Sequence, residues 1–146
     1  MNRMNARAIS QYRNVYAQRG ANGPGGYHVV QMLLAGALDR LAAASGHMHS
    51  QDVAAKGECI SRVIEIITAL RGALDHGVDG ELTSRLDALY EYMMHRLFIA
   101  NVDNDPELLE EVSELLRSLK SSWDAIPEQV QQPLAGTPVP RSAVSL

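Results

Sequence analysis

Residues 82–100 read LTSRLDALYEYMMHRLFIA, and this stretch decides the fold class of the chain. Its apolar residues recur at every third or fourth position, at Leu82, Leu86, Leu89, Met93, Leu97 and Ala100. Such spacing lines one face of an α-helix, whereas a half-buried strand alternates apolar and polar residues. The stretch therefore predicts a helix. We expect its inward face to be soft and aromatic, carrying Tyr90, Tyr92, Met93, Met94 and Phe98.

Three other segments repeat this helical pattern. The first covers residues 30–41 and is followed by Gly46, the second covers residues 60–74 and is followed by Gly77, and the last covers residues 112–126. No stretch alternates for long, and no turn signal joins two β-rich runs. Four amphipathic helices of similar length, joined by short connections, predict an all-α protein folded as an antiparallel up-down four-helix bundle.

Polar residues precede the expected helix starts. Ser50 and Asp79 stand where N-caps belong, because their side chains can accept hydrogen bonds from the free N–H groups of a first turn. Asp105 followed by Pro106 is a stronger start, since the fixed φ of proline suits the first helical position.

The chain divides into a lid, a hinge, the bundle and a tail, which we expect over residues 1–19, 20–26, 27–126 and 127–146. The lid is a short N-terminal amphipathic helix with Ile9, Tyr12 and Tyr16 on one side, too small to be stable alone. The hinge is rich in glycine. Prolines recur through the C-terminal tail, which predicts that it is disordered or extended.

Composition limits the classes of function. The formal net charge of −4, with no stripe of Lys or Arg, argues against nucleic-acid binding. Cys59 is the only cysteine, so no internal disulfide is possible and a reducing cytoplasm fits. We see no signal peptide and no run of about 18 apolar residues, and therefore expect a cytoplasmic protein without membrane insertion.

Catalysis receives little support from the motifs. The glycines at 20–26 follow no strand and lack the Lys-Ser/Thr of a phosphate-binding loop. His47 and His49 lie in an expected turn, with no further metal ligand suggested nearby. Glu91 and His95 are four residues apart, whereas a di-metal bundle needs inward-facing Glu-x-x-His pairs on two helices. We expect neither an enzyme nor a bound cofactor or metal.

Interaction with another protein is what remains. A Met- and Tyr-rich helix, a hinged lid and long interhelical grooves are the parts of a receptor that takes a helix into a groove. One alternative is a bundle that sequesters a regulator, as an anti-sigma factor does, or that merely oligomerises. Another is a bundle that holds a metal or cofactor.

The residues resemble the flagellar export chaperones of the FliS type over about residues 8–126. The most specific piece is the run from Leu86 to Leu97, LDALYEYMMHRL, followed by Ala100-Asn101 and Asn104-Asp105. Further pieces are Gln31 to Leu38 (QMLLAGAL), Lys56-Gly57-Glu58, Glu111-Val112, Leu115-Leu116 and Trp123. Their order and spacing together carry the resemblance.

This resemblance implies a cytoplasmic four-helix bundle that binds the disordered C-terminal segment of flagellin. Such a chaperone prevents premature polymerisation and degradation of flagellin, and delivers it to the type III export gate, the cytoplasmic domain of FlhA. The resemblance also implies an N-terminal patch related to the gate, at Ile9 and Tyr12. It implies a flagellin groove at Met32, Leu34, Leu38, Tyr90, Met93, Met94, Leu97 and Asn101. Each apolar groove residue could instead belong to the core, and Met94 is the one we most expect to point outward.

Overall fold

The computed structural model describes residues 26–74 and 80–125. These residues form four α-helices and no strand. The helices are α2 (Gly26–His49), α3 (Val53–Gly72), α4 (Gly80–Asp103) and α5 (Pro106–Asp124). The all-α prediction is therefore confirmed. The lid, most of the hinge and the tail lie outside the described residues, so that part of the domain scheme stays a prediction.

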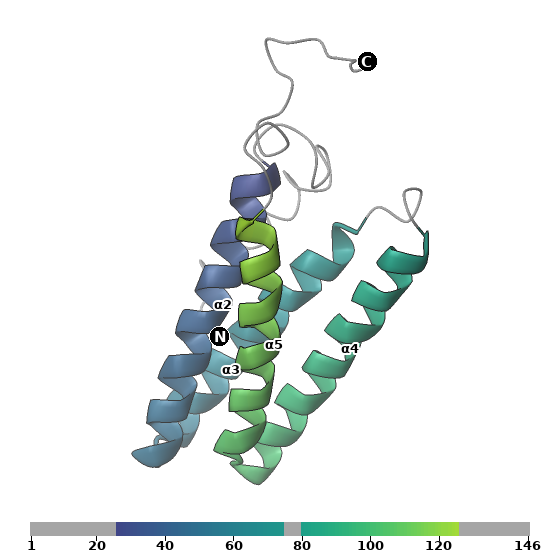
Figure 1. Cartoon of the computed structure of the whole chain (residues 1–146). Coiled ribbons are helices and arrows are strands. Elements are labelled where there is room, and N and C mark those ends of the chain that lie inside the picture. The colour runs from purple at the N-terminus through teal and green to yellow at the C-terminus, as the bar shows by residue number, and fades with distance from the viewer. Residues whose placement is uncertain (1–25, 75–79, 126–146) are drawn as a thin grey trace, which may run out of the picture.

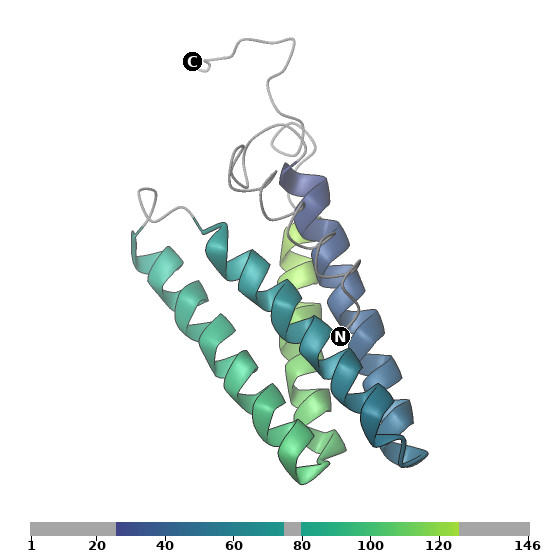
Figure 2. The same cartoon turned by 180° about the vertical axis from the view of Figure 1, so that it is seen from behind.

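Successive helices run in opposite directions and form the four sides of a bundle (Figure 1). α2 packs against α3 and α5, and α4 packs against the same two helices, so α2 and α4 are diagonal to each other. The α2–α3 and α4–α5 turns lie at the same end. Towards the opposite end the α3–α4 pair leans away from the α2–α5 pair, as Figure 2 also shows. The predicted antiparallel up-down bundle is confirmed.

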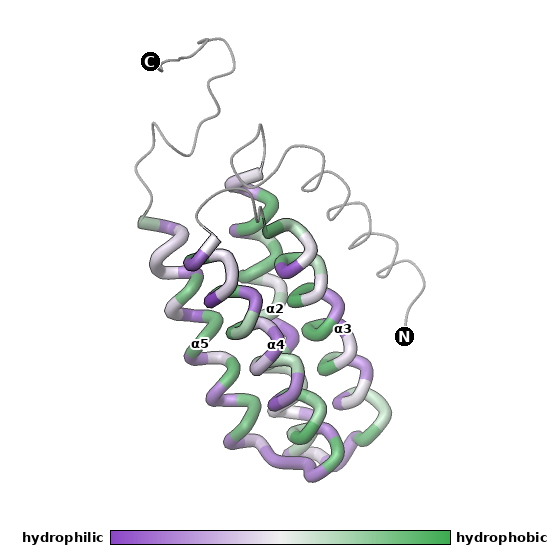
Figure 3. The backbone as a smooth tube through the Cα atoms, turned by 90° about the vertical axis from the view of Figure 1, so that its right-hand side faces the viewer, coloured by the Kyte–Doolittle hydropathy of each residue, from purple (hydrophilic) through white to green (hydrophobic). Residues whose placement is uncertain are grey.

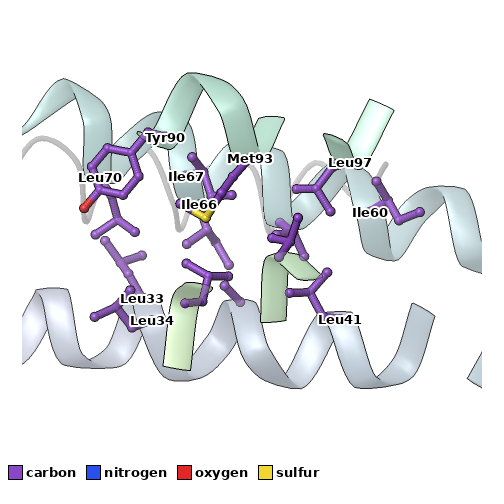
Figure 4. Close-up of a cluster of buried hydrophobic side chains, with 14 of the residues drawn as sticks. Leu33, Leu34, Leu41, Ile60, Ile66, Ile67, Leu70, Tyr90, Met93 and Leu97 are labelled. Atoms are coloured by element: carbon purple, nitrogen blue, oxygen red, sulfur yellow. The ribbon is translucent and has the colours of Figure 1, made fainter. Parts of the chain in front are cut away.

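All four helices contribute to one hydrophobic core. Figure 3 shows apolar and polar residues alternating around each helix, as expected for amphipathic helices. Leu33, Leu34 and Leu41 of α2 point into the cluster that also holds Tyr90, Met93 and Leu97 of α4 (Figure 4). The largest side chains that are fully buried include Leu41, Ile60, Ile67, Leu70, Met93, Leu97, Leu109 and Leu116.

The aromatic inward face expected for α4 is only partly correct. Tyr90 and Met93 are buried, but the Tyr92 side chain is 42% exposed and Phe98 is 62% exposed. The helical period explains the difference, because each residue turns the helix by about 100°. Tyr92 and Phe98 are each one position away from a buried residue, Met93 and Leu97, and so lie on the flanks of the helix.

The helix ends correct two predictions. Asp52, not Ser50, caps α3, and its carboxylate accepts a hydrogen bond from the Ala55 N–H at 3.1 Å. Gly46 does not end α2, which continues to His49. A glycine inside a helix costs only about 1 kcal/mol, and the buried side chain of Met48 lies in the turn that follows it.

The expected start of the last helix is confirmed. Asp105 accepts a hydrogen bond from the Glu107 N–H at 2.9 Å, and Pro106 is the first helical residue. Gly77, expected to end the second helix, and Asp79, expected to start the third, lie outside the described residues. The second helix, α3, in fact ends earlier, at Gly72.

Candidate functional site

The residues expected to form a flagellin groove occupy three kinds of environment. Met32 is 52% exposed, and Leu38, Met94 and Asn101 are half-buried. The other four are buried in the core: Leu34, Tyr90, Met93 and Leu97. Ile9 and Tyr12 lie outside the described residues.

These residues do not line a single groove, because they come from the diagonal helices α2 and α4. Leu38 lines a hollow between α2 and α5, opposite Leu109 and Ser113. Met94 and Asn101 lie instead beside α3, near Thr68 and Gly57. The structure therefore divides the expected site between different seams of the bundle. A seam here is the line along which two neighbouring helices pack against each other.

The α2–α5 seam has a hollow in one part, and in another part it is bridged by aromatic residues. The hollow has a volume of about 400 Å³. On the α2 side, its lining includes the small residues Ala42 and Ser45. Farther along the seam, the Trp123 ring stacks on Tyr27 with ring centroids 5.5 Å apart, and its indole N–H donates to the Tyr27 main-chain oxygen at 2.9 Å. These contacts tie the end of α5 to the start of α2.

The α4–α5 seam carries a three-residue polar cluster. The Tyr92 hydroxyl donates to Glu111 Oε2 at 2.5 Å, and Arg96 Nε donates to Glu111 Oε1 at 2.8 Å. The Arg96 guanidinium also lies 5.6 Å from the centroid of the Tyr92 ring. The hydrogen bond from Tyr92, followed by that from Arg96, lowers the pKa of Glu111, and the same bond raises the pKa of Tyr92. This cluster bridges the seam.

The α3–α4 seam is bridged in its upper part, towards the end where the helix pairs lean apart. Arg71 holds Asp87 through two hydrogen bonds of 2.6 and 3.1 Å, and Glu91 lies 4.0 Å from the same guanidinium. Next along the seam, the Thr68 hydroxyl lies 3.5 Å from the Met94 sulfur.

The lower part of the α3–α4 seam is open and is lined by both polar and apolar residues. Two adjoining hollows of about 670 and 560 Å³ lie there, and both are lined by Asp52 and Asn101. Val53 and Val102 line the smaller one and are 70% and 66% exposed. Phe98 lies one turn before Val102 on α4 and is also exposed.

The sequence reasoning missed this surface. The sequence does contain a signal for this surface, because Phe98 and Val102 are four residues apart and lie off the apolar stripe that fills the core. The sequence pattern instead led us to expect Phe98 on the inward face of the helix, whereas the structure exposes both Phe98 and Val102.

Within residues 26–74 and 80–125, no group of three His, Cys, Asp or Glu side chains is placed to hold a metal ion. Cys59 is a buried free thiol. None of the described helices is long and apolar enough to cross a membrane.

Comparison with known proteins gives a consistent set of similarities. A family model described as "Flagellar protein FliS" matches residues 8–130. The flagellar secretion chaperone FliSB of Pseudomonas aeruginosa is 44% identical over 120 residues, which is 82% of this chain and 95% of that protein. The flagellar secretion chaperone FliS of Vibrio cholerae is 34% identical, over 84% of this chain and 90% of its own. The Escherichia coli protein of the same name is also 34% identical, with 88% and 98% covered.

Proposed function

Because this chain belongs to the FliS family of flagellar secretion chaperones, which are not enzymes, we propose that it binds the C-terminal segment of flagellin. In this proposal the complex forms in the cytoplasm, where it protects the segment from premature polymerisation and degradation. The chaperone then delivers flagellin to the type III export gate, the cytoplasmic domain of FlhA.

The observation that carries the proposal is a set of exposed apolar side chains on a bundle whose core is already filled. Met32, Phe98 and Val102 are each more than half exposed, while every helix buries a complete apolar stripe elsewhere. The fold does not need these side chains for its own core. Apolar side chains at interhelical seams are suited to bind the apolar face of an added helix.

We assign the contacts with the client to those residues of the expected groove whose side chains are exposed or half-buried. Met32, Leu38, Met94 and Asn101 offer side-chain surface to a client. The four buried members of the expected groove support that surface from beneath: Leu34, Tyr90, Met93 and Leu97. Ile9 and Tyr12 remain the residues that we assign to the step at the gate.

The energetics of a disordered client suit a chaperone that must also release it. A segment that folds on binding buries on the order of 1,000–3,000 Å² but spends about 2–5 kcal/mol on its own ordering. The affinity is therefore moderate for the area covered. Moderate affinity allows transfer to the gate without an energy source in the chaperone.

Calorimetric titration with the C-terminal segment of flagellin from the same organism tests the proposal. We expect saturable binding of one segment per chaperone, with a clearly negative heat-capacity change from buried apolar surface. A segment of equal length with its apolar residues replaced by serine is the control. No binding at high micromolar concentration by a folded sample would reject flagellin as the client and favour a sequestered regulator instead.

A further inference from the structure

We propose that the first half of α4, residues 80–89, is an arm that opens away from the bundle as a unit and is latched shut by Arg71 of α3. The second half of α4, from Tyr90 onward, stays anchored in the core. Opening uncovers the leucines on the inner face of the arm, so the latch controls access to apolar surface at this end of the bundle. The movement does not depend on what the protein binds.

The two halves of α4 are buried to different degrees. Four of its five buried residues lie in the second half: Tyr90, Met93, Leu97 and Ala100. The arm contributes only Thr83. Because packing of an apolar face supplies most of the free energy that holds a helix in a protein, the arm is the more weakly held half.

The exposure of one apolar stripe shows where α4 leaves the core. Met93 and Leu97, the later members of the stripe, are fully buried. Leu86 and Leu89 are half-buried, and Leu82, at the start of the stripe, is 52% exposed. The inner face of α4 therefore lifts off the bundle progressively towards the start of the helix, in the direction in which the helix pairs lean apart (Figure 1).

The arm also loses its neighbour on one side. Asp87 lies opposite Arg71, and α3 ends one residue after Arg71, at Gly72. Because α3 and α4 are antiparallel, most of the arm before Asp87 extends beyond the last residue of α3. On its other side, α4 leans away from the α2–α5 pair towards this end, as Figure 2 also shows.

Arg71 stands at the point where the arm leaves α3. Its Nε and Nη2 atoms donate to the two carboxylate oxygens of Asp87 at 2.6 and 3.1 Å, a paired geometry that orients both side chains. The same guanidinium lies 4.0 Å from Glu91, in the first turn of the anchored half. One cation thus joins both halves of α4 to the end of α3. The Arg71 and Asp87 side chains are about one-third exposed, so water can replace this contact when the arm opens.

Amide hydrogen exchange of the full-length protein, resolved by residue, tests the arm. Where closing is faster than exchange from the open state, the exchange rate reports the population of the open state. We expect the amides of residues 84–89 to share one protection factor, lower than that of residues 93–100. Equal protection in both halves would overturn the inference. A gradual decline towards Gly80, residue by residue, would also overturn it, because simple fraying of a helix end gives that pattern.

Arg71→Gln tests the latch. It should raise the exchange rates of the arm by about three- to tenfold and leave those of residues 93–100 unchanged. Arg96→Gln is the matched control, because Arg96 pairs with Glu111 at similar exposure but on the anchored half. It should leave the exchange of the arm unchanged. Asp87→Asn should act as Arg71→Gln does, and the double variant should add little, since both changes remove one contact.

Thiol reactivity measures the access that opening provides. A cysteine introduced by Leu86→Cys lies on the inner face of the arm, and Cys59, a buried free thiol of α3, serves as the reference in the same chain. Adding Arg71→Gln should speed modification of the introduced thiol by a factor similar to that seen in exchange. The reactivity of Cys59 should not change.

Three results would overturn the latch. In the first, Arg71→Gln leaves the exchange of the arm as it is in the wild type. In the second, it raises exchange equally throughout α4 and speeds modification of Cys59, which indicates loss of stability of the whole bundle. In the third, Arg96→Gln frees the arm as much as Arg71→Gln does, so that Arg71 holds no special position.

Discussion

Lys56 of α3 donates a hydrogen bond of 3.0 Å from its buried ammonium group to the main-chain oxygen of Asn101 in α4. A second bond, to Asn104 Oδ1, reaches the residue after α4, whose backbone has a positive φ of 53°. One side chain thus joins the start of α3 to the last turn of α4 and to the α4–α5 turn. The bundle end with the two turns is held by this polar contact as well as by apolar packing.

Replacing Lys56 with methionine removes the ammonium group but keeps an unbranched apolar side chain. The Asn101 oxygen then loses its donor, so we expect the free energy of unfolding to fall by about 1–3 kcal/mol. Urea denaturation measures this change. Lys120→Met is the control, because Lys120 pairs with Asp124 at the surface, and it should change stability little. Equal stability of the two variants would contradict a structural role for Lys56.

Leu97 and its neighbour Phe98 should differ sharply when each is shortened. Leu97 is fully buried, so Leu97→Ala leaves a cavity and is expected to cost about 2–5 kcal/mol. Phe98 is 62% exposed, so Phe98→Ala should change stability by no more than about 0.5 kcal/mol. Thermal or urea unfolding of both variants provides the measurement. A large loss of stability from Phe98→Ala would show that this ring belongs to the core.

Met94→Asp is expected to weaken binding of the flagellin segment with only a modest change in melting temperature. Met94 is half-buried beside Thr68, so a carboxylate at this position can reach solvent while it disrupts the apolar seam. Met93→Asp is the contrasting variant, because Met93 is fully buried and the charge should unfold the bundle. A fall in melting temperature as large for Met94→Asp as for Met93→Asp would remove Met94 from the client surface.

The hydrogen bond between Tyr92 and Glu111 predicts a dependence of stability on acid pH. Tyr92 and Arg96 lower the pKa of Glu111 in the folded state from its ordinary 4.5. The carboxylate therefore stabilises the fold fully above about pH 4.5, and that contribution is lost as the pH falls through the lowered value.

Tyr92→Phe should raise the pKa of Glu111 towards its ordinary value and make the loss of stability in acid shallower. Carboxyl chemical shifts followed through a pH titration report the pKa directly. Tyr90→Phe is the control, since the buried Tyr90 has its own pKa raised to about 12 by burial and titrates in a different range. An unchanged pKa of Glu111 in Tyr92→Phe would show that Arg96 alone determines it.

The two candidate cap residues of α3, Asp52 and Ser50, should differ in how much each stabilises the fold. Asp52 accepts a hydrogen bond from the first turn, so Asp52→Ala is expected to cost about 1 kcal/mol. Ser50 lies in the preceding turn and donates to the His47 main-chain oxygen, with a distance of 3.3 Å. Ser50→Ala should therefore have much the smaller effect on the midpoint of unfolding. The reverse order would restore the cap expected from the sequence.

The fold was predictable because its dominant signal is periodic. Leucines and isoleucines at helical spacing define four buried stripes, and Asp105-Pro106 marks one start without ambiguity. The choice between Ser50 and Asp52 was harder, since it depends on Gln51, whose positive φ of 60° reverses the chain between them. Such a turn conformation leaves little trace in the identity of the residue.

The candidate site was less predictable than the fold. Sequence spacing shows which residues share a face of one helix, but not which helices are neighbours. Leu38 and Met94 belong to helices that are diagonal to each other, a fact that only the packing of the bundle shows. For the same reason, no pattern within α4 shows that Val102 lies across a hollow from Val53 of α3.

The arrangement in which each helix packs on the next one along the chain has a kinetic consequence. Helical proteins dominated by contacts between near neighbours in sequence fold in microseconds to milliseconds, because little loop-closure entropy must be lost before the contacts form. Among the four described helices, the α2–α5 pairing is the one extensive contact between helices that are far apart in the sequence. Synthesis proceeds at about 5–20 residues per second, so a new copy completes its fold far faster than a ribosome can extend another chain by one residue. The protein is thus ready to act almost as soon as it has been made.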